Sequence, residues 1–352
     1  MVAILGLATA VPPYALEQDE VTARALRVYA PVIARFPNLA DVFVNAGIER
    51  RYSVRPIDWF EEPHDWRGRN DAYLDGAQTL FAEAAQAALA RAGLQARDVD
   101  VVVTVSSTGV ATPSLEARMA DRLGFRSDVM RVPVFGLGCA GGVSGLSIGA
   151  RLARAAPGDV VLVVVVELCT LAFRSDRNEK ADVISSALFG DGAAALVLRA
   201  GDADGAARAA ARIVRTAEHI WPRTLDIMGW SIDPAGFGVV LSRSLPRFVE
   251  RKLAAPARKF ASSVVGNGRT IFHPGGAKVL DAVQAALGLG HDAVADERHV
   301  LRHYGNMSAP TVLFVLERVL RRGFAGPAVM AALGPGFTAS FAALDAAGAT
   351  DA

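Results

Sequence analysis

The chain has 352 residues, of which 52% are hydrophobic, so it is long enough to bury a deep core and we expect a globular protein. Lys and Arg number 37 and Asp and Glu number 36, and this near balance excludes a general attraction to nucleic acid or to acidic membranes. Only two cysteines are present, Cys139 and Cys169, which excludes a disulfide framework and favours a reducing, cytoplasmic location.

Strand-like and helix-like segments alternate along the chain. Residues 1–13 are apolar but lack a basic region and a small-residue cleavage site, so we predict a first strand and no signal peptide. The longest aliphatic run, 160–166, is far shorter than the roughly 20 residues that span a bilayer, and we expect no stable membrane insertion. The alternation predicts an α/β architecture with a largely parallel sheet covered by helices. Its clearest elements are strands at 99–105, 132–135 and 160–166 and helices at 114–123 and 142–155.

The turn at 136–142, with the sequence Gly-Leu-Gly-Cys-Ala-Gly-Gly, supports two hypotheses. Its glycines spell the G-x-G-x-x-G pattern of a dinucleotide phosphate turn, and Glu167 follows the next strand where a ribose-binding acid is expected. Cys139 would instead be a nucleophile if free backbone N–H groups and the helix dipole stabilise its thiolate. Cys139 occupies the point where the backbone must approach a pyrophosphate, which weighs against an NAD-binding protein.

Similar patterns in the two halves of the chain predict an internal duplication. An Ala-rich helix ends at a Gly-Leu break before a short apolar run in 84–103 and again in 282–301. Residues 188–193 and 333–338 are glycine-containing turns that each lead into an apolar strand. Two βαβ-type halves that face each other can form a site between them.

Of the six histidines, His273 and His303 compete as the partner of a nucleophilic cysteine. His273 ends an apolar run before Pro-Gly-Gly and a helix, where α/β proteins often present binding residues. His303 is followed closely by Asn306, an amide shortly before another helix. A Cys, a His and an Asn at such junctions can hold a thioester, because the thiol carries the acyl group while imidazole and amide N–H groups stabilise an oxyanion.

Five motifs follow one another along the chain: Gly-Cys-Ala-Gly-Gly at 138–142, and the segments 187–194, 272–276, 304–308 and 334–338. In this order they resemble the motifs of type III polyketide synthases, the chalcone synthase-like enzymes, over essentially the whole chain. The resemblance implies the thiolase fold, with duplicated βαβ halves in a layered α/β/α/β/α arrangement, and a homodimer. The N-terminal half would be residues 1–200, carrying Cys139, and the C-terminal half residues 201–352, carrying His273 and Asn306.

The resemblance assigns a role to each of these three residues. Cys139 would take a starter acyl group from coenzyme A, and His273 would hold its thiolate as an ion pair. His273 and Asn306 would bind the thioester carbonyl of malonyl-CoA while carbon dioxide leaves. Negative charge then builds on an oxygen that two fixed donors stabilise. No metal or redox cofactor is required, since coenzyme A thioesters are the substrates.

The resemblance also implies which residues line the cavity. Phe189 matches a phenylalanine between the coenzyme A tunnel and the cavity, and Val239 matches a second such position that is usually Phe in plant members. The smaller Val239 favours an aliphatic chain over an aromatic starter. The remaining implied cavity residues are Ser107, Thr112, Cys169, Trp230, Ser308, Gly334, Pro335 and Gly336.

Coenzyme A binding is implied at Lys278, which matches a family lysine near the tunnel entrance. The other basic positions of plant members fall on Asn38, Asp41 and Asn45, none of which is cationic. Phosphate contacts would then come from elsewhere, for example from Arg50 or Arg51.

Segments 167–174, 226–230 and 236–240 resemble bacterial members that make alkylresorcinols or alkylpyrones from fatty acyl-CoA. We therefore expect iterative decarboxylative Claisen condensation of malonyl-CoA on an acyl starter, followed by cyclisation. The nearest alternative is the ketoacyl synthase that initiates fatty acid synthesis and uses acyl carrier protein. An NAD-binding protein and a non-catalytic thiolase-fold protein are the alternatives from other classes.

Overall fold

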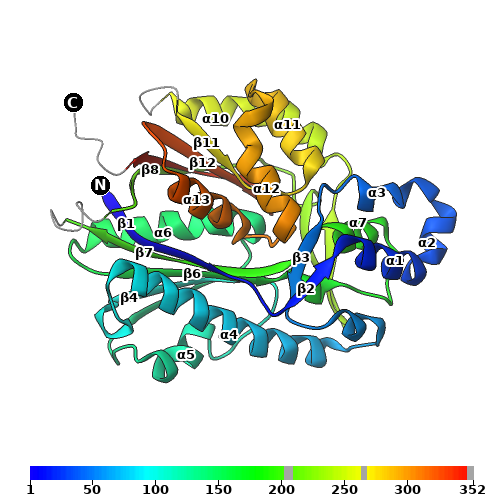
Figure 1. Cartoon of the computed structure of the whole chain (residues 1–352), viewed down its shortest axis with the longest axis horizontal. Coiled ribbons are helices and arrows are strands. Elements are labelled where there is room, and N and C mark those ends of the chain that lie inside the picture. Colours follow the sequence, from blue (N-terminus) through cyan, green and yellow to red (C-terminus); the bar gives the residue numbers. More distant parts are fainter. Residues whose placement is uncertain (202–208, 263–267, 347–352) are drawn as a thin grey trace.

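The computed structural model describes residues 1–201, 209–262 and 268–346, and its frame is one nine-stranded sheet with helices on both sides (Figure 1). The sheet order is β11-β12-β13-β8-β1-β7-β6-β4-β5, and two further pairs, β2 with β3 and β9 with β10, lie outside it. The strands are β1 (Val2–Ala10), β2 (Tyr14–Glu17), β3 (Arg50–Ser53), β4 (Val101–Val105), β5 (Met130–Val134), β6 (Val161–Leu168), β7 (Asp191–Ala200), β8 (Ala211–Ile220), β9 (Met228–Asp233), β10 (Gly236–Leu241), β11 (Arg269–Phe272), β12 (Pro327–Gly334) and β13 (Thr338–Ala346).

Helices connect and cover these strands. The α-helices are α1 (Gln18–Val28), α2 (Ala30–Arg35), α3 (Asp41–Val44), α4 (Trp66–Ala92), α5 (Leu115–Leu123), α6 (Gly141–Ala155), α7 (Lys180–Leu188), α9 (Leu245–Lys252), α10 (Ala254–Ala261), α11 (Ala277–Leu287), α12 (Ala295–Tyr304) and α13 (Thr311–Arg322). Short 3-10 turns are η1 (Pro37–Leu39), η2 (Ile57–Glu61), η3 (Ala96–Asp98), η4 (Gly138–Ala140), η5 (Cys169–Ala172) and η6 (His291–Val294). In the described part of the chain, no helix combines the length and the apolar character that crossing a membrane requires.

Local sequence explains the best-defined elements. Strand β6 is a run of β-branched and aliphatic side chains that is buried throughout, as expected for a strand covered on both faces. Helix α4 starts where the Asp65 side chain accepts the Gly68 N–H at 2.7 Å, and it ends at Gly93, which adopts the left-handed conformation. The predicted first strand is confirmed as β1, and the predicted elements from 99 to 166 are confirmed as β4, α5, β5, α6 and β6.

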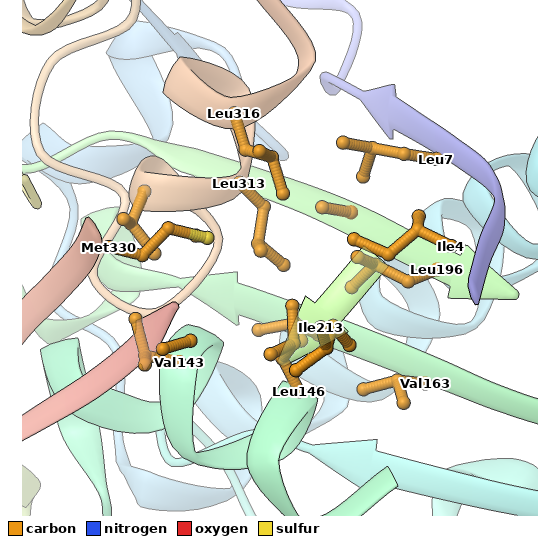
Figure 2. Close-up of a cluster of buried hydrophobic side chains, with 14 of the residues drawn as sticks. Ile4, Leu7, Val143, Leu146, Val163, Leu196, Ile213, Leu313, Leu316 and Met330 are labelled. Atoms are coloured by element: carbon orange, nitrogen blue, oxygen red, sulfur yellow. The ribbon is translucent and has the colours of Figure 1, made fainter. Parts of the chain in front are cut away.

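The core lies in layers around α6 and α13. Helix α6 contacts β4 and β6 of the first half and also β12 and β13 of the second, so both halves of the sheet pack onto it. Figure 2 shows part of this core, in which Leu146 of α6 and Leu313 of α13 lie near Ile4, Leu196 and Met330 from three strands. Helices α4 and α5 cover the outer face of the first half, and α10 and α11 cover the second (Figure 1). The predicted α/β fold class with helices on both sides is thus confirmed.

The prediction of a largely parallel sheet is wrong. Only the β4–β5, β4–β6 and β11–β12 pairs are parallel, whereas the pairs that join β6, β7, β1, β8, β13 and β12 are antiparallel. Each half runs from a parallel pair into antiparallel strands, in the order β4-β6-β7-β1 and β11-β12-β13-β8. Buried strands read as apolar runs whichever way they point, so strand direction cannot be read from the pattern.

The two halves therefore share an order of strands, as the predicted duplication requires. Of the two segment pairs that suggested it, however, 84–103 and 282–301 are not structurally equivalent. The run after the first Gly-Leu break becomes β4, whereas the run in 282–301 continues into η6 and α12. The other pair holds, because 188–193 leads into β7 and 333–338 leads into β13, which occupy equivalent places in the two halves of the sheet.

Candidate active site

Cys139 lies in the turn between β5 and α6, and its side chain is partly buried. Gly136 and Gly138 adopt φ angles of 92° and 47°, which favour glycine. A Cβ atom on Gly138 would lie 2.7 Å from Cδ of Pro335 in the loop between β12 and β13. The turn that presents Cys139 is therefore packed directly against the second half of the chain.

His273 directly follows β11, and its backbone N–H donates to the Ala331 carbonyl at 2.9 Å. Its side chain is buried, and neither ring nitrogen has a hydrogen-bond partner among the residues that the structure describes. Burial lowers the pKa of His273 to about 3 and so favours the neutral imidazole. Both ring nitrogens are thus available to a substrate or to the cysteine.

Asn306 follows α12 after Gly305, whose φ is 68°. Its Nδ2 donates to the Gly275 carbonyl at 3.1 Å, and its Oδ1 accepts the Ser308 N–H at 2.8 Å. The amide is therefore held with its N–H group beside the turn that carries His273.

Cys139, His273 and Asn306 all line one cavity of about 980 Å³, so the structure brings the three residues together. Burial raises the pKa of the Cys139 thiol to about 11, and the nearby Glu167 charge acts in the same direction. Hydrogen bonding with Ser308 and Asn306 opposes this rise in pKa. The ion pair between Cys139 and His273 stays a prediction, since burial favours the neutral form of each partner.

Glu167 is a buried carboxylate at the end of β6 whose relation to Cys139 was not predicted from the sequence. One oxygen accepts the Ser107 N–H at 2.9 Å and the Thr108 hydroxyl at 2.8 Å, while the other oxygen has no partner within the described part of the chain. Burial raises the pKa of Glu167 to about 8. A single acidic residue near the end of an otherwise apolar strand, two residues before Cys169, was the available signal.

Most of the implied wall residues surround the same cavity. Trp230 Nε1 donates to the Ser107 carbonyl at 2.9 Å, and its ring meets Phe189 edge-on at 6.5 Å between centroids. Both rings line the cavity that Cys139 also lines. The other implied residues that line the cavity are Cys169, Val239, Lys278, Ser308 and Pro335.

Thr112, Gly334 and Gly336 are not among the residues that line this cavity. Thr112 lies on an exposed loop. A Cβ atom on Gly334 would lie 2.6 Å from Cβ of Ala140, so this glycine supports the cysteine turn from behind.

The cavity is lined by more cations than the family resemblance implies. Arg35, Lys180 and Arg243 line it together with Lys278. The Lys180 ammonium lies 3.2 Å from the centre of the Phe36 ring. The Arg50 guanidinium pairs instead with Glu17 at 2.6 Å.

A second, smaller pocket of about 70 Å³ adjoins the main cavity. Cys169 and Phe189 line both spaces. The small pocket has the apolar residues Leu16, Val21, Ala25, Val28, Ile57, Phe60 and Phe173 in its walls, together with Arg24, Arg51, Glu61, Thr170, Ser185 and Ser186. Within residues 1–201, 209–262 and 268–346, no three His, Cys, Asp or Glu side chains gather in a way that could hold a metal ion.

Known proteins match the chain over nearly its full length. Residues 61–202 match the family model of the N-terminal domain of chalcone and stilbene synthases, and residues 212–342 match that of the C-terminal domain. A 1,3,6,8-tetrahydroxynaphthalene synthase of Streptomyces peucetius subsp. caesius is 38% identical over 97% of this chain and 92% of its own length. A putative chalcone synthase of Bacillus subtilis (strain 168) is 33% identical over 96% of this chain and 97% of its own length.

The fold has a close counterpart among solved structures. The 1,3,6,8-tetrahydroxynaphthalene synthase of Streptomyces coelicolor A3(2), described as a bacterial type III polyketide synthase, superposes with a TM-score of 0.91. It is 27% identical, and the match covers 99% of this chain and all of that one.

Proposed function

The chain belongs to the chalcone and stilbene synthases and is a type III polyketide synthase, and from this premise we propose that it extends a fatty acyl-CoA starter with malonyl-CoA and cyclises the product to an alkylpyrone or alkylresorcinol. One observation carries the chemistry: Cys139, His273 and Asn306 come from both halves of the chain and line one cavity. The ketoacyl synthase, NAD-binding and non-catalytic alternatives lose their support with this membership.

Loading begins at Cys139. Its thiolate attacks the carbonyl carbon of the acyl-CoA, a new carbon–sulfur bond forms, and coenzyme A leaves as a thiolate that takes up a proton. The thiolate requires a positive partner, because burial alone raises the pKa of Cys139 to about 11. His273 is proposed for this role, since it lines the same cavity as Cys139 and neither of its ring nitrogens has a partner among the described residues.

Extension follows on the same three residues. The bond between the malonyl carboxylate and its neighbouring carbon breaks, carbon dioxide leaves, and the electron pair remains as a thioester enolate. His273 and the Asn306 amide donate to the enolate oxygen, which bears more charge than the carbonyl it came from. The enolate carbon attacks the Cys139 thioester and expels the thiolate, so that the lengthened chain is carried on coenzyme A.

The small apolar pocket supports an aliphatic starter. It lies beyond Cys169 and Phe189, and burial of each CH₂ group there would contribute about 0.8 kcal/mol to binding. Val239 in the main cavity is smaller than a phenylalanine and leaves room for the same chain.

A second candidate starter is malonyl-CoA itself. The Trp230 ring beside Phe189 favours a short starter, because it narrows the route from Cys139 toward the apolar pocket. The similarity to two tetrahydroxynaphthalene synthases supports an aromatic polyhydroxylated product in that case.

Coenzyme A is proposed to bind with its phosphates against Arg35, Lys180, Arg243 and Lys278 at the outer end of the cavity. These cations take the place of the basic positions that are Asn38, Asp41 and Asn45 in this chain, which also line that region. Replacing Lys180 and Arg243 by alanine should raise KM for malonyl-CoA while changing kcat less.

A homodimer is proposed to form along β5. This strand ends the sheet, with one edge unpaired in the part of the chain that the structure describes. Apolar side chains are exposed beside it: Met130 by 52%, Phe135 by 57% and Val110 by 45%. A second copy would cover them and the exposed Thr112 loop nearby, and it would pair the free edge. A cytoplasmic location is proposed because the Cys139 and Cys169 thiols must stay reduced.

A starter scan tests the proposed function. Purified enzyme is given malonyl-CoA and acyl-CoA starters of two to about twenty carbons without carrier protein, and products are identified by mass spectrometry. Incorporation of long starters supports the fatty acyl proposal, and products from malonyl-CoA alone, with long starters ignored, support the second candidate. Cys139→Ala should abolish condensation, and an absolute need for carrier protein would overturn both.

A further inference from the structure

Arg51 on β3 is a buried arginine that has no carboxylate partner among the described residues. Its guanidinium donates to the carbonyls of Ser186 at 2.7 Å, Ala187 at 2.8 Å and Phe189 at 3.0 Å. It also donates to the side-chain oxygen of Gln18. Buried cations are normally paired with carboxylates, so this arrangement requires another source of negative charge.

The carboxyl end of α7 supplies that charge. The last carbonyls of a helix have no partner within the helix and together carry about half a negative charge. Burial lowers the pKa of Arg51 to about 9, which still leaves the side chain protonated at neutral pH. Gln18 assists, since its Nε2 donates to the Ala187 and Phe43 carbonyls at 3.2 Å each.

The same end of α7 is joined to Asn306. The Gly190 N–H donates to the Asn306 carbonyl at 3.0 Å, and the Asn306 N–H donates to the Leu188 carbonyl at 2.8 Å. These bonds pair Phe189 with Asn306 as an isolated bridge between the two halves of the chain. The end of α7 and the catalytic asparagine therefore cannot shift independently.

The stem of Arg51 lies against both sides of this bridge. A Cβ atom on Gly190 would lie 3.2 Å from Cβ of Arg51, and one on Gly305 would lie 3.3 Å from it. These glycines directly follow Phe189 and directly precede Asn306. Arg51 thus touches both strands of the bridge with its stem and holds one of them with its guanidinium.

We propose that Arg51 is a positioning residue that fixes Phe189 and Asn306 as one rigid unit, setting the amide for malonyl decarboxylation and the phenylalanine for selection of chain length. The inference rests on the function proposed above for Asn306 and Phe189. Misplacing a catalytic group by about 1 Å can reduce the rate about 100-fold. Loss of Arg51 is therefore expected to act on kcat, because the cations that hold coenzyme A lie elsewhere.

The test measures decarboxylation of malonyl-CoA without a starter, and then the products formed with an acyl-CoA starter, in Arg51→Met. We expect kcat for decarboxylation to fall about 10- to 100-fold, with KM for malonyl-CoA within about threefold of wild type. The product spectrum should broaden as Phe189 loosens, and it should broaden in Gln18→Met as well, because Arg51 lines the small pocket directly whereas Gln18 lines neither pocket. Arg51→Lys keeps the charge but has a single nitrogen for three carbonyls, so its kcat should lie in between.

Arg69 provides a matched control. It is also buried without an ion-pair partner among the described residues, and it donates to the Leu171 and Phe173 carbonyls at 3.0 and 2.5 Å, away from the bridge. Arg69→Met should lower the thermal unfolding midpoint yet keep decarboxylation per folded molecule within about twofold of wild type. A similar loss of kcat in both variants would reduce Arg51 to a merely structural role.

Gln18→Met keeps the inference testable if Arg51→Met does not fold, because it loosens the same carbonyls while retaining the arginine. It should reduce kcat for decarboxylation severalfold. The inference would be overturned if folded Arg51 and Gln18 variants had the kcat and the products of the wild type while Asn306→Ala was inactive. If Asn306→Ala instead keeps decarboxylating malonyl-CoA, the function proposed for Asn306 is wrong. The role of Arg51 in positioning Phe189 is then tested by the product spectrum alone, and an unchanged spectrum would overturn it.

Discussion

Replacing Glu167 by glutamine should stabilise the protein relative to wild type by an amount that grows as pH rises from acidic to alkaline. The glutamine oxygen can accept the same two hydrogen bonds, from the Ser107 N–H and the Thr108 hydroxyl. The second carboxylate oxygen has no partner among the described residues, so the amide nitrogen that replaces it has no acceptor for its hydrogens. The cost of burying that amide does not depend on pH, so the change of stability with pH isolates the effect of the charge.

The magnitude follows from the pKa of Glu167, which burial raises from its ordinary value of 4.5 to about 8. Below pH 4.5 the group is protonated in both the folded and the unfolded state, so it makes no pH-dependent difference. Between pH 4.5 and 8 it ionises only in the unfolded chain, and folding loses stability as pH rises. A pKa difference of one corresponds to about 1.4 kcal/mol, which sets a ceiling of about 5 kcal/mol, and we expect about 1 to 3 after structural relaxation.

Urea denaturation of wild type and Glu167→Gln at pH 5, 6, 7 and 8.5, at one protein concentration, measures this difference. The free energy of unfolding of the variant should rise relative to wild type across the series. Glu49→Gln, at an exposed glutamate, serves as the control and should show no such trend. Stability curves for wild type and Glu167→Gln that stay parallel across the series would refute the reasoning.

Three further outcomes follow from the site. With His273→Gln, alkylation of Cys139 by iodoacetamide should rise about tenfold for each pH unit from 7 to 9, since burial raises the pKa of this thiol to about 11, whereas an ion-paired wild type should level off earlier. Identical profiles would contradict the ion pair. Val239→Phe should lower kcat/KM about tenfold or more for long acyl-CoA starters and spare short ones. Gly142→Ala places a Cβ atom 2.3 Å from the Ala309 carbonyl oxygen and should cost about 1 to 3 kcal/mol of stability in urea melts, so an unchanged midpoint would show that α6 has room to move.

The sequence predicted the elements of the first half because their signals are local. The valine run of β6 and the glycine-rich turn before α6 are each visible within a few neighbouring residues. Whether neighbouring strands are parallel or antiparallel was not predictable. An antiparallel sheet with one face in water shows alternating polar and apolar residues, but here both faces are buried and that pattern is absent. The segment 282–301 misled for a related reason, since an alanine-rich helix followed by an apolar run fits both a strand and the start of α12.

In the site too, residues in local motifs were predictable and residues gathered only by the tertiary fold were not. Cys139, His273 and Asn306 stand in short motifs, and the structure places all three on one cavity. Arg35, Lys180 and Arg243 have no motif and come from segments far apart, so only folding brings them to the wall of one cavity. The sequence offers Arg51 as a cation for phosphate, but its buried position at the end of α7 depends on the pairing of β3 with β2 and not on its neighbours in sequence.

Strands β1 and β8 pair through backbone hydrogen bonds and so join the two halves of the sheet. The walls of the active-site cavity between the halves are therefore fixed. A two-lobed enzyme with a hinge can widen its cleft as a product grows, but here backbone ladders continue from one half into the other. The volume of this cavity therefore stays constant and limits the length of the growing polyketide. Changes of product in such a protein are expected to come from single side chains on the cavity wall, such as Trp230 or Val239, and not from changes in how the halves are set.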